Sequence, residues 1–168
     1  MSISFDMIDS YHNVYPDYPP QFDMITDTIA VGSLYSSYDS FDLIVNMAFR
    51  YDGNGFKRHI ITQCTENGKE IIRVGIHDIP TEPLDIILIE LIPFLLNYIK
   101  KHPTHRILIH CQAGMSRSGS VAIALLSKLY SISFEDALAF AKQKRPMIQP
   151  NEGFIKMIEM YITNGIKY

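Results

Sequence analysis

Cys111 and Arg117 bound a short loop whose residue types suit phosphate chemistry. An apolar, β-branched run ends at His110-Cys111, and apolar residues with helical spacing resume after Gly119. A loop that enters a helix N-terminus points successive backbone N–H groups inward, where the helix macrodipole adds partial positive charge. The loop interior is uncharged and consists of Gln112, Ala113, Gly114, Met115 and Ser116. We therefore predict that the loop holds a phosphate dianion beside the Cys111 sulfur.

The positive field of such a loop favours Cys111 as a thiolate, which is the nucleophilic form. The pKa of a free cysteine is roughly 8.5, and helix N-termini and nearby cations lower it to about 3.5–7.5. Arg117 offers a planar fork that matches two phosphate oxygens, and Gly114 lets the chain adopt a positive φ. Ser118 can donate a hydrogen bond to the sulfur and so help it to leave in a second step.

The pattern Cys-x5-Arg followed by Ser resembles the signature loop of the cysteine-dependent protein phosphatases. With His110 before the cysteine and Ala113-Gly114 inside the loop, it is most similar to the small dual-specificity phosphatases. A strand–helix turn with an inert buried cysteine is the alternative that a bare Cys-x5-Arg leaves open. The flanking strand, the helix and Ser118 favour the catalytic interpretation, because structural context is what supports a short motif.

A general acid is also needed, because an alkoxide or phenoxide leaves badly unless it is protonated. The resemblance implies an aspartate about thirty residues before the nucleophile, and Asp78 precedes Cys111 by 33 positions. The same carboxylate could then activate the water that hydrolyses the phosphocysteine. Asp78 could instead be a turn or cap residue, and Asp85 is the second candidate acid, although it is better suited to cap a helix that begins near Leu84. We interpret His77 as a surface neighbour.

Two further residues are expected to support the loop. His110 lies next to the nucleophile on a buried strand, so we favour an orienting role by hydrogen bonding over proton transfer. Residues 150–154 resemble the segment that follows the third helix in dual-specificity phosphatases, and the resemblance implies that Asn151 helps to hold the phosphate loop. A capped helix N-terminus is the simpler alternative for Asn151.

Hydrophobic periodicity predicts strands that alternate with helices, and therefore one α/β domain with a central, mostly parallel sheet flanked by helices. The resemblance implies a three-layer sandwich. Residues 1–22, which are rich in Tyr, Pro and Asp and have weak periodicity, are expected to form an N-terminal arm, with 23–168 as the catalytic domain. The predicted strands are 26–31, 41–48, 71–76 and 106–110, with a hairpin near 59–62. The predicted helices are 84–101 with a kink or break near Pro93, 117–130, one from Ser133 to before Pro146, and one from Pro150 onward.

Composition argues against several classes of protein. A net charge of −3 argues against nonspecific nucleic-acid binding. The two cysteines, Cys64 and Cys111, form no CxxC pair, so we expect neither a disulfide framework nor a zinc site, and we expect a reducing compartment such as the cytoplasm or nucleus. Whether Cys64 forms a protective disulfide with Cys111 on oxidation is left open, although we favour the interpretation of Cys64 as a plain buried or loop cysteine.

The N-terminal residues and the most apolar segment predict neither a signal peptide nor a membrane anchor. The N-terminal residues lack the basic and apolar segments of a signal peptide. The segment 84–101 contains Glu90, Pro93 and Asn97 and is shorter than the ~20 residues that a membrane span needs. We expect no cofactor, no metal ion and no membrane partner. The oligomeric state stays open, and the N-terminal arm could mediate dimerisation.

The neutral loop interior bears on the substrate. The resemblance implies that relatives acting on phosphoinositides or RNA 5′-triphosphates carry extra basic or histidine residues between the cysteine and the arginine. None is present here, which favours phosphotyrosine, phosphoserine and phosphothreonine of a protein. A lipid or RNA phosphatase of the same chemistry and a non-catalytic phosphate-binding module remain the alternatives. Lys142, Lys144 and Arg145 could form a basic rim that attracts acidic or multiply phosphorylated partners, although a solvated helix face is the default interpretation.

Overall fold

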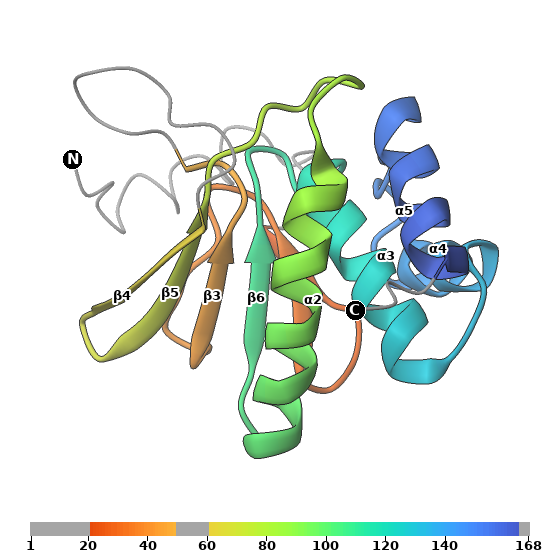
Figure 1. Cartoon of the computed structure of the whole chain (residues 1–168). Helices are drawn as coiled ribbons and strands as arrows, with labels where there is room; N and C mark the ends of the chain where they lie inside the picture. Colours follow the sequence, from red (N-terminus) through yellow and green to blue (C-terminus); the bar gives the residue numbers. More distant parts are fainter. Residues whose placement is uncertain (1–20, 50–60, 165–168) are drawn as a thin grey trace.

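The computed structural model describes residues 21–49 and 61–164, which form one six-stranded sheet and the helices packed on it (Figure 1). The strand order is β1-β2-β6-β3-β5-β4. The four inner strands run parallel, and the two edge strands pair antiparallel with their neighbours. The prediction of a mostly parallel α/β sheet is therefore confirmed. The strands are β1 (Phe22–Met24), β2 (Ile29–Gly32), β3 (Leu43–Asn46), β4 (Ile61–Glu66), β5 (Lys69–Val74) and β6 (Ile107–His110).

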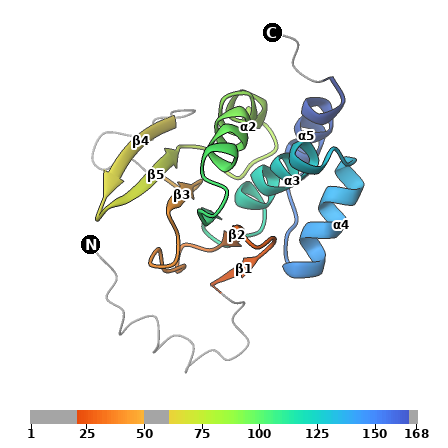
Figure 2. The same ribbon diagram turned by 90° about the horizontal axis from the view of Figure 1, so that it is seen from below.

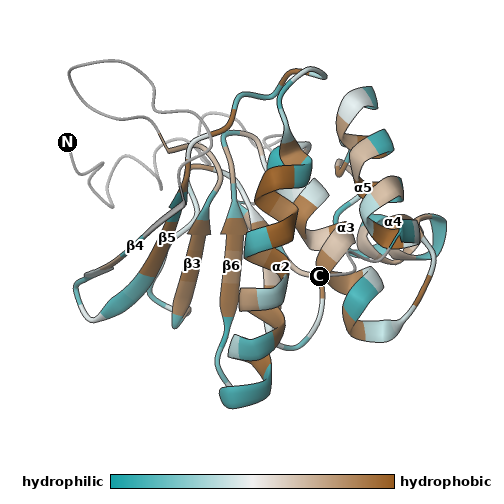
Figure 3. Ribbon diagram, in the orientation of Figure 1, coloured by the Kyte–Doolittle hydropathy of each residue, from teal (hydrophilic) through white to brown (hydrophobic). Residues whose placement is uncertain are grey.

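The helices of the described chain pack together on one face of the sheet, as the view from below shows (Figure 2). Alternate residues of each inner strand point to that face, for example Ile107 and Ile109 on β6, because side chains alternate across a strand. Figure 3 shows that β3 and β6 are coloured mainly as hydrophobic, with α2 beside β6. The helices are α2 (Leu84–Lys101), α3 (Arg117–Tyr130), α4 (Phe134–Lys144) and α5 (Glu152–Asn164).

The opposite face of the sheet carries a smaller apolar cluster. Leu108 and Ile44 point to this side, and Phe41 from the β2–β3 loop covers them. Tyr38 of the same loop packs at the margin of the cluster. Within residues 21–49 and 61–164, loop side chains rather than a helix thus form the layer on this face.

Most expected elements lie where the sequence placed them, with two local differences. The hairpin of β4 and β5 turns at Asn67-Gly68, whose positive φ values of 50° and 77° suit a tight two-residue turn. It therefore lies later than the expected 59–62, of which residues 59 and 60 are outside the described part. Helix α2 continues through the exposed Pro93, so of the kink or break expected there the break does not occur. Buried leucines on both sides of Pro93 hold the helix to the sheet.

The starts of α4 and α2 are capped differently. The Ser133 hydroxyl accepts a hydrogen bond of 3.1 Å from the backbone N–H of Asp136 and so caps α4. Asp85, in contrast, lies exposed in the first turn of α2, and Pro83 occupies the cap position without a side-chain hydrogen bond. The prediction that Asp85 caps this helix is wrong, because the cap position is Pro83, two residues before Asp85.

Cys64 and Cys111 are too far apart to form a disulfide in this fold. Cys64 of β4 lies opposite Ile71, Ile71 lies opposite Ile44, and Ile44 lies opposite Leu108. Three strand spacings of about 4.8 Å separate Cys64 from Leu108, and Cys111 lies farther along the chain. Since a disulfide needs Cα atoms within about 7 Å, the protective disulfide is excluded without a large rearrangement.

Two structural facts bear on the remaining expectations. None of the helices in the described ranges is both long and apolar enough to cross a membrane. Within the same ranges no cluster of three or more His, Cys, Asp or Glu side chains has a metal-binding arrangement. Residues 1–20 of the expected arm lie outside the described part, and Phe22 already pairs in the sheet.

Candidate active site

The Cys111–Arg117 loop lies at the carboxyl end of β6 and leads directly into α3. This end of a strand is where open parallel sheets bind their ligands. Gly114 has a φ of +71°, which confirms the expected positive φ. A Cβ atom on Gly114 would lie only 2.6 Å from the backbone oxygen of Gly32, so the loop can close against β2 only with glycine here.

Cys111 is buried, with 2% of its surface exposed, and its sulfur receives a hydrogen bond from Ser118. The Ser118 Oγ donates to Cys111 Sγ at 3.2 Å. Burial alone would raise the pKa of the Cys111 thiol, but the hydrogen bonds from Ser118, the charge of Arg117 and the backbone of Gly114 together lower that pKa below its ordinary value. The structure thus contains the surroundings that favour a thiolate.

Arg117 is aimed by two backbone carbonyl groups at the ends of neighbouring strands. Its Nη1 donates to the oxygen of Ile76 at 3.2 Å and to that of Met47 at 3.4 Å. Its Nε is buried and has no hydrogen-bond partner among the described residues. The guanidinium is therefore anchored at one nitrogen and keeps a donor that an anion could use.

Asp78 lies at the mouth of the loop and is held by two side chains. Its Oδ1 accepts hydrogen bonds from Ser116 Oγ at 2.7 Å and from Asn151 Nδ2 at 2.9 Å. Ser116 Oγ in turn accepts from the backbone N–H of Asn151 at 3.0 Å. The expected acid, the loop and the segment before α5 therefore meet at one point.

Asn151 also caps α5, since its Oδ1 accepts a 2.9 Å hydrogen bond from the backbone N–H of Phe154. The helix cap expected of Asn151 is therefore present. Asn151 contacts the phosphate loop through its backbone N–H, which donates to Ser116 Oγ, while its side-chain nitrogen holds Asp78. Gly153 is important for the contact between the segment after Asp78 and the start of α5. A Cβ atom there would collide with the carbonyl oxygen of Pro80, so glycine lets the segment after Asp78 rest directly on the start of α5.

His110 is buried behind the loop and hydrogen-bonds to Tyr38. The distance from His110 Nε2 to the Tyr38 hydroxyl is 2.6 Å. Burial lowers the pKa of His110 to about 4, partly offset by the backbone of Cys111, and burial raises the pKa of Tyr38 to about 12. Both shifts favour the uncharged form of these groups at neutral pH, and the orienting role expected of His110 stays a prediction.

Comparison with known proteins places this constellation in a family. The model of the family described as "Dual specificity phosphatase, catalytic domain" matches residues 33–164. The chain belongs to this family. It is similar to human dual specificity protein phosphatase 21, with 46% identity over 56 residues, which are 33% of this chain and 30% of that protein. It is also similar to mouse dual specificity protein phosphatase 14, with 34% identity over 92 residues, which are 55% of this chain and 46% of that protein.

The matched segments thus span less than half of these relatives. The fold is also that of solved members of the family. The crystal structure of human DUSP28 superposes with a TM-score of 0.72 at 22% identity, covering 87% of this chain and 95% of that one.

A cavity of about 510 Å³ opens above the loop of this dual-specificity phosphatase domain. Arg117 is the one basic side chain among the described residues that line it, and Asp78 is the one acidic side chain. The second candidate acid, Asp85, does not line this cavity, and neither does the half-buried His77. The remaining lining residues are Cys111, Gln112, Ala113, Met115, Ser116, Gln149, Pro150 and Asn151.

One expectation about this phosphatase domain is wrong. Arg145 does not join Lys142 and Lys144 in an exposed basic rim, because its side chain is completely buried against the phosphate loop. The helical spacing of the three residues gave no indication of this. Tyr38 was missed for a similar reason, since its partner His110 is 72 positions away in the sequence. Neither contact has a local sequence signal.

Proposed function

We propose that this domain is a protein phosphatase that hydrolyses phosphotyrosine, phosphoserine and phosphothreonine through a cysteinyl-phosphate intermediate. The observation that carries the proposal is the arrangement of Cys111, Arg117 and Asp78 around one cavity. The sulfur lies at its floor, the guanidinium beside it and the carboxyl group at its mouth. A phosphate ester in this cavity would have a nucleophile on one side and a proton donor on the other.

In the first step the Cys111 thiolate attacks phosphorus, and the bond from phosphorus to the ester oxygen breaks. Arg117 Nε and the inward backbone N–H groups bind the phosphate oxygens, whose charge is stabilised by these fixed donors. Protonated Asp78 gives its proton to the departing oxygen. Since Oδ1 of Asp78 already accepts two hydrogen bonds, Oδ2 is the oxygen suited to carry that proton.

In the second step water attacks the phosphorus of the phosphocysteine, and the bond from phosphorus to sulfur breaks. The Asp78 carboxylate takes a proton from the water, so the carboxyl group returns to its starting form. The sulfur leaves as a thiolate, which the Ser118 hydroxyl stabilises across the 3.2 Å contact. The products are inorganic phosphate and the free enzyme, ready for another cycle.

The lining of the cavity favours a singly phosphorylated protein side chain as substrate. An inositol phosphate or an RNA 5′-triphosphate carries additional negative charge, which would need additional cations. Among the described lining residues Arg117 alone is basic, and Gln112, Met115 and Gln149 are neutral. A lipid or RNA phosphate is therefore the less favoured substrate. A non-catalytic module is disfavoured because the nucleophile, the phosphate-binding arginine and a placed carboxyl group are all present.

The chemistry is tested by the hydrolysis of an aryl phosphate by the wild type and by Cys111→Ser. We expect the Cys111→Ser variant to lose activity by several orders of magnitude, because a serine hydroxyl is not ionised in this environment. Cys64→Ser is the matched control and should retain full activity, since Cys64 lies on the far strand β4. Equal rates for the wild type and Cys111→Ser would overturn the thiolate mechanism.

The substrate class is tested separately with three probes at equal concentration. These are phosphotyrosine and phosphothreonine peptides, vesicles that contain a phosphoinositide, and an RNA with a 5′-triphosphate. We expect the largest kcat/KM for the peptides. A larger kcat/KM for the vesicles or the RNA would retain the mechanism and overturn the assignment of substrate.

A further inference from the structure

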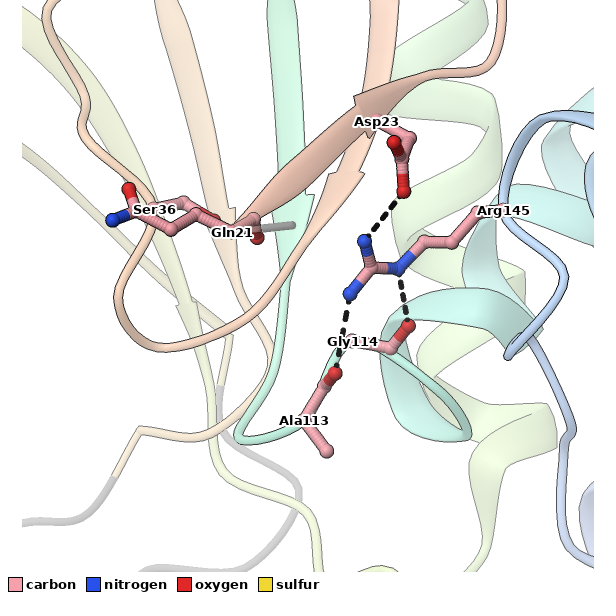
Figure 4. Close-up of polar contacts among 6 residues, drawn as sticks. All are labelled: Gln21, Asp23, Ser36, Ala113, Gly114 and Arg145. Atoms are coloured by element: carbon pink, nitrogen blue, oxygen red, sulfur yellow. Dashed lines mark hydrogen bonds and ion pairs between the residues drawn. The ribbon is translucent and has the colours of Figure 1, made fainter. Parts of the chain in front are cut away.

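Arg145 is a buried cation that lies directly behind the phosphate loop (Figure 4). Its Nε donates to the backbone oxygen of Gly114 at 2.8 Å, and its Nη2 donates to that of Ala113 at 3.3 Å. Its Nη1 forms an ion pair of 2.7 Å with Asp23 on the edge strand β1. A single guanidinium therefore joins two carbonyl groups of the loop to a strand that is distant in the sequence.

The two carbonyl groups belong to consecutive peptide units of the loop. In a planar trans peptide the C=O and N–H bonds point in opposite directions. When Arg145 holds the Ala113 oxygen on the outer side of the loop, the N–H of Gly114 must point inward. When it holds the Gly114 oxygen, the N–H of Met115 must also point inward. These are the donors that a loop of this kind offers to an anion.

We infer that Arg145 is a positioning residue for the reaction, which turns these two peptide units so that their N–H groups face the phosphate and the Cys111 sulfur. The inference rests on the proposed phosphatase function. Two observations support it. The backbone of Gly114 is among the groups that favour the thiolate form of Cys111, and a Cβ atom on Gly114 would lie 2.6 Å from Arg145 Nη2. The guanidinium thus fits closely against the turning point of the loop.

Asp23 clamps Arg145 in this position. Its side chain is 26% exposed, whereas that of Arg145 is 0% exposed, so the carboxylate supplies counter-charge to a cation that has left water. The start of β1 is fixed in turn by Gln21, which lies beside Ser36 in Figure 4. Its backbone oxygen accepts hydrogen bonds of 2.7 Å from Ser36 Oγ and from the N–H of Ser33. The edge strand is thereby coupled to the chemistry at Cys111.

A purely structural role for Arg145 makes a different prediction. If Arg145 only joined α4 to the loop and β1, its replacement would lower the thermal stability of the protein. The protein that remains folded would then bind phosphate and react at Cys111 as before. A positioning role changes the properties of the loop itself. Two such properties are the pH midpoint for alkylation of Cys111 and the affinity for inorganic phosphate, and neither requires turnover.

The test uses Cys64→Ser protein, so that Cys111 is the one reactive thiol. Arg145→Met removes the donors, Arg145→Lys keeps the charge but cannot reach both carbonyl groups in a fork, and Asp23→Asn removes the clamp. Lys144→Met is the matched control, because it removes the neighbouring cation, which is exposed. Each variant is measured for its melting temperature, for the iodoacetamide alkylation rate between pH 4 and 9, and for phosphate affinity by calorimetry.

We expect both Arg145 variants to bind phosphate about tenfold more weakly, which corresponds to ~1.4 kcal/mol, and to alkylate with a higher pH midpoint. Asp23→Asn should change both properties in the same direction by less, and Lys144→Met should behave as the parent.

The inference is overturned if Arg145→Lys and Arg145→Met melt at lower temperature yet keep the parent's midpoint and affinity. If Arg145→Met does not fold, Arg145→Lys and Asp23→Asn decide by the same two measurements. Failure of the proposed function would instead appear as a wild type that does not hydrolyse phosphate esters.

Discussion

The Ser116 hydroxyl donates a 2.7 Å hydrogen bond to Asp78, which ties the segment after β5 to the phosphate loop. Asn151 completes the tie from the start of α5. The carboxyl group is thereby placed over the cavity by two neutral side chains rather than by a cation. Its position depends on three segments that are far apart in the sequence and meet only in the folded chain.

Asn151→Asp is expected to disturb the acid without disturbing the helix. An aspartate oxygen can still accept the hydrogen bond from Phe154, and aspartate is as good a cap as asparagine. The donor to Asp78 is lost, however, and a second negative charge then faces the acid. We expect kcat for an alkyl phosphate to fall roughly ten- to hundredfold, with a melting temperature close to that of the wild type. A variant with a much lower melting temperature and an unchanged kcat would contradict this role.

Asp78→Ala is expected to slow the release of poor leaving groups far more than that of good ones. A phenoxide with a strongly acidic conjugate acid leaves without help, whereas an alkoxide needs a proton. General acid catalysis contributes typically 10²–10⁴-fold, so the loss should approach this range for alkyl phosphates and be small for activated aryl phosphates. The measurement is kcat/KM across a series of leaving groups. Asp85→Ala is the matched control, and a steeper leaving-group dependence in that variant than in Asp78→Ala would show that the acid is misassigned.

Ser118→Ala is expected to raise the pKa of Cys111. Burial opposes the thiolate, and the Ser118 hydrogen bonds are the largest of the contributions that favour it. Because the thiolate is the reactive form, the acid limb of kcat/KM and the midpoint of iodoacetamide alkylation should both move to higher pH. At pH 6 the variant should therefore alkylate more slowly than the wild type. An unchanged midpoint would show that Arg117 and the loop amides are sufficient to keep the pKa of Cys111 low.

The phosphate loop could be predicted from the sequence because its chemistry is carried by consecutive residues between Cys111 and Ser118. Its strand, its helix and the positive φ of Gly114 follow from the same local pattern. Arg145 could not be predicted, because its partners are Gly114 and Ala113, 31 and 32 positions earlier, and Asp23, 122 positions earlier. Local spacing identifies Arg145 only as one of three basic residues near the end of a helix. Buried polar contacts of this kind depend on tertiary pairing, which periodicity does not encode.

His110 is expected to make the protein less stable in mild acid. Burial lowers its pKa to about 4 in the folded state, against about 6.5 in the unfolded chain. Between these values the unfolded state binds more protons, so the free energy of unfolding must fall as the pH is lowered. The contribution of this one group amounts to about 2 kcal/mol between pH 7 and pH 5.

The measurement is urea unfolding at both pH values for the wild type, His110→Gln and Tyr38→Phe. His110→Gln should lose this part of the pH dependence. Tyr38→Phe should keep it, because His110 stays buried, and should be less stable at both pH values for lack of the 2.6 Å hydrogen bond. Equal pH dependence in the wild type and His110→Gln would show that His110 does not titrate between the two states as the structure requires.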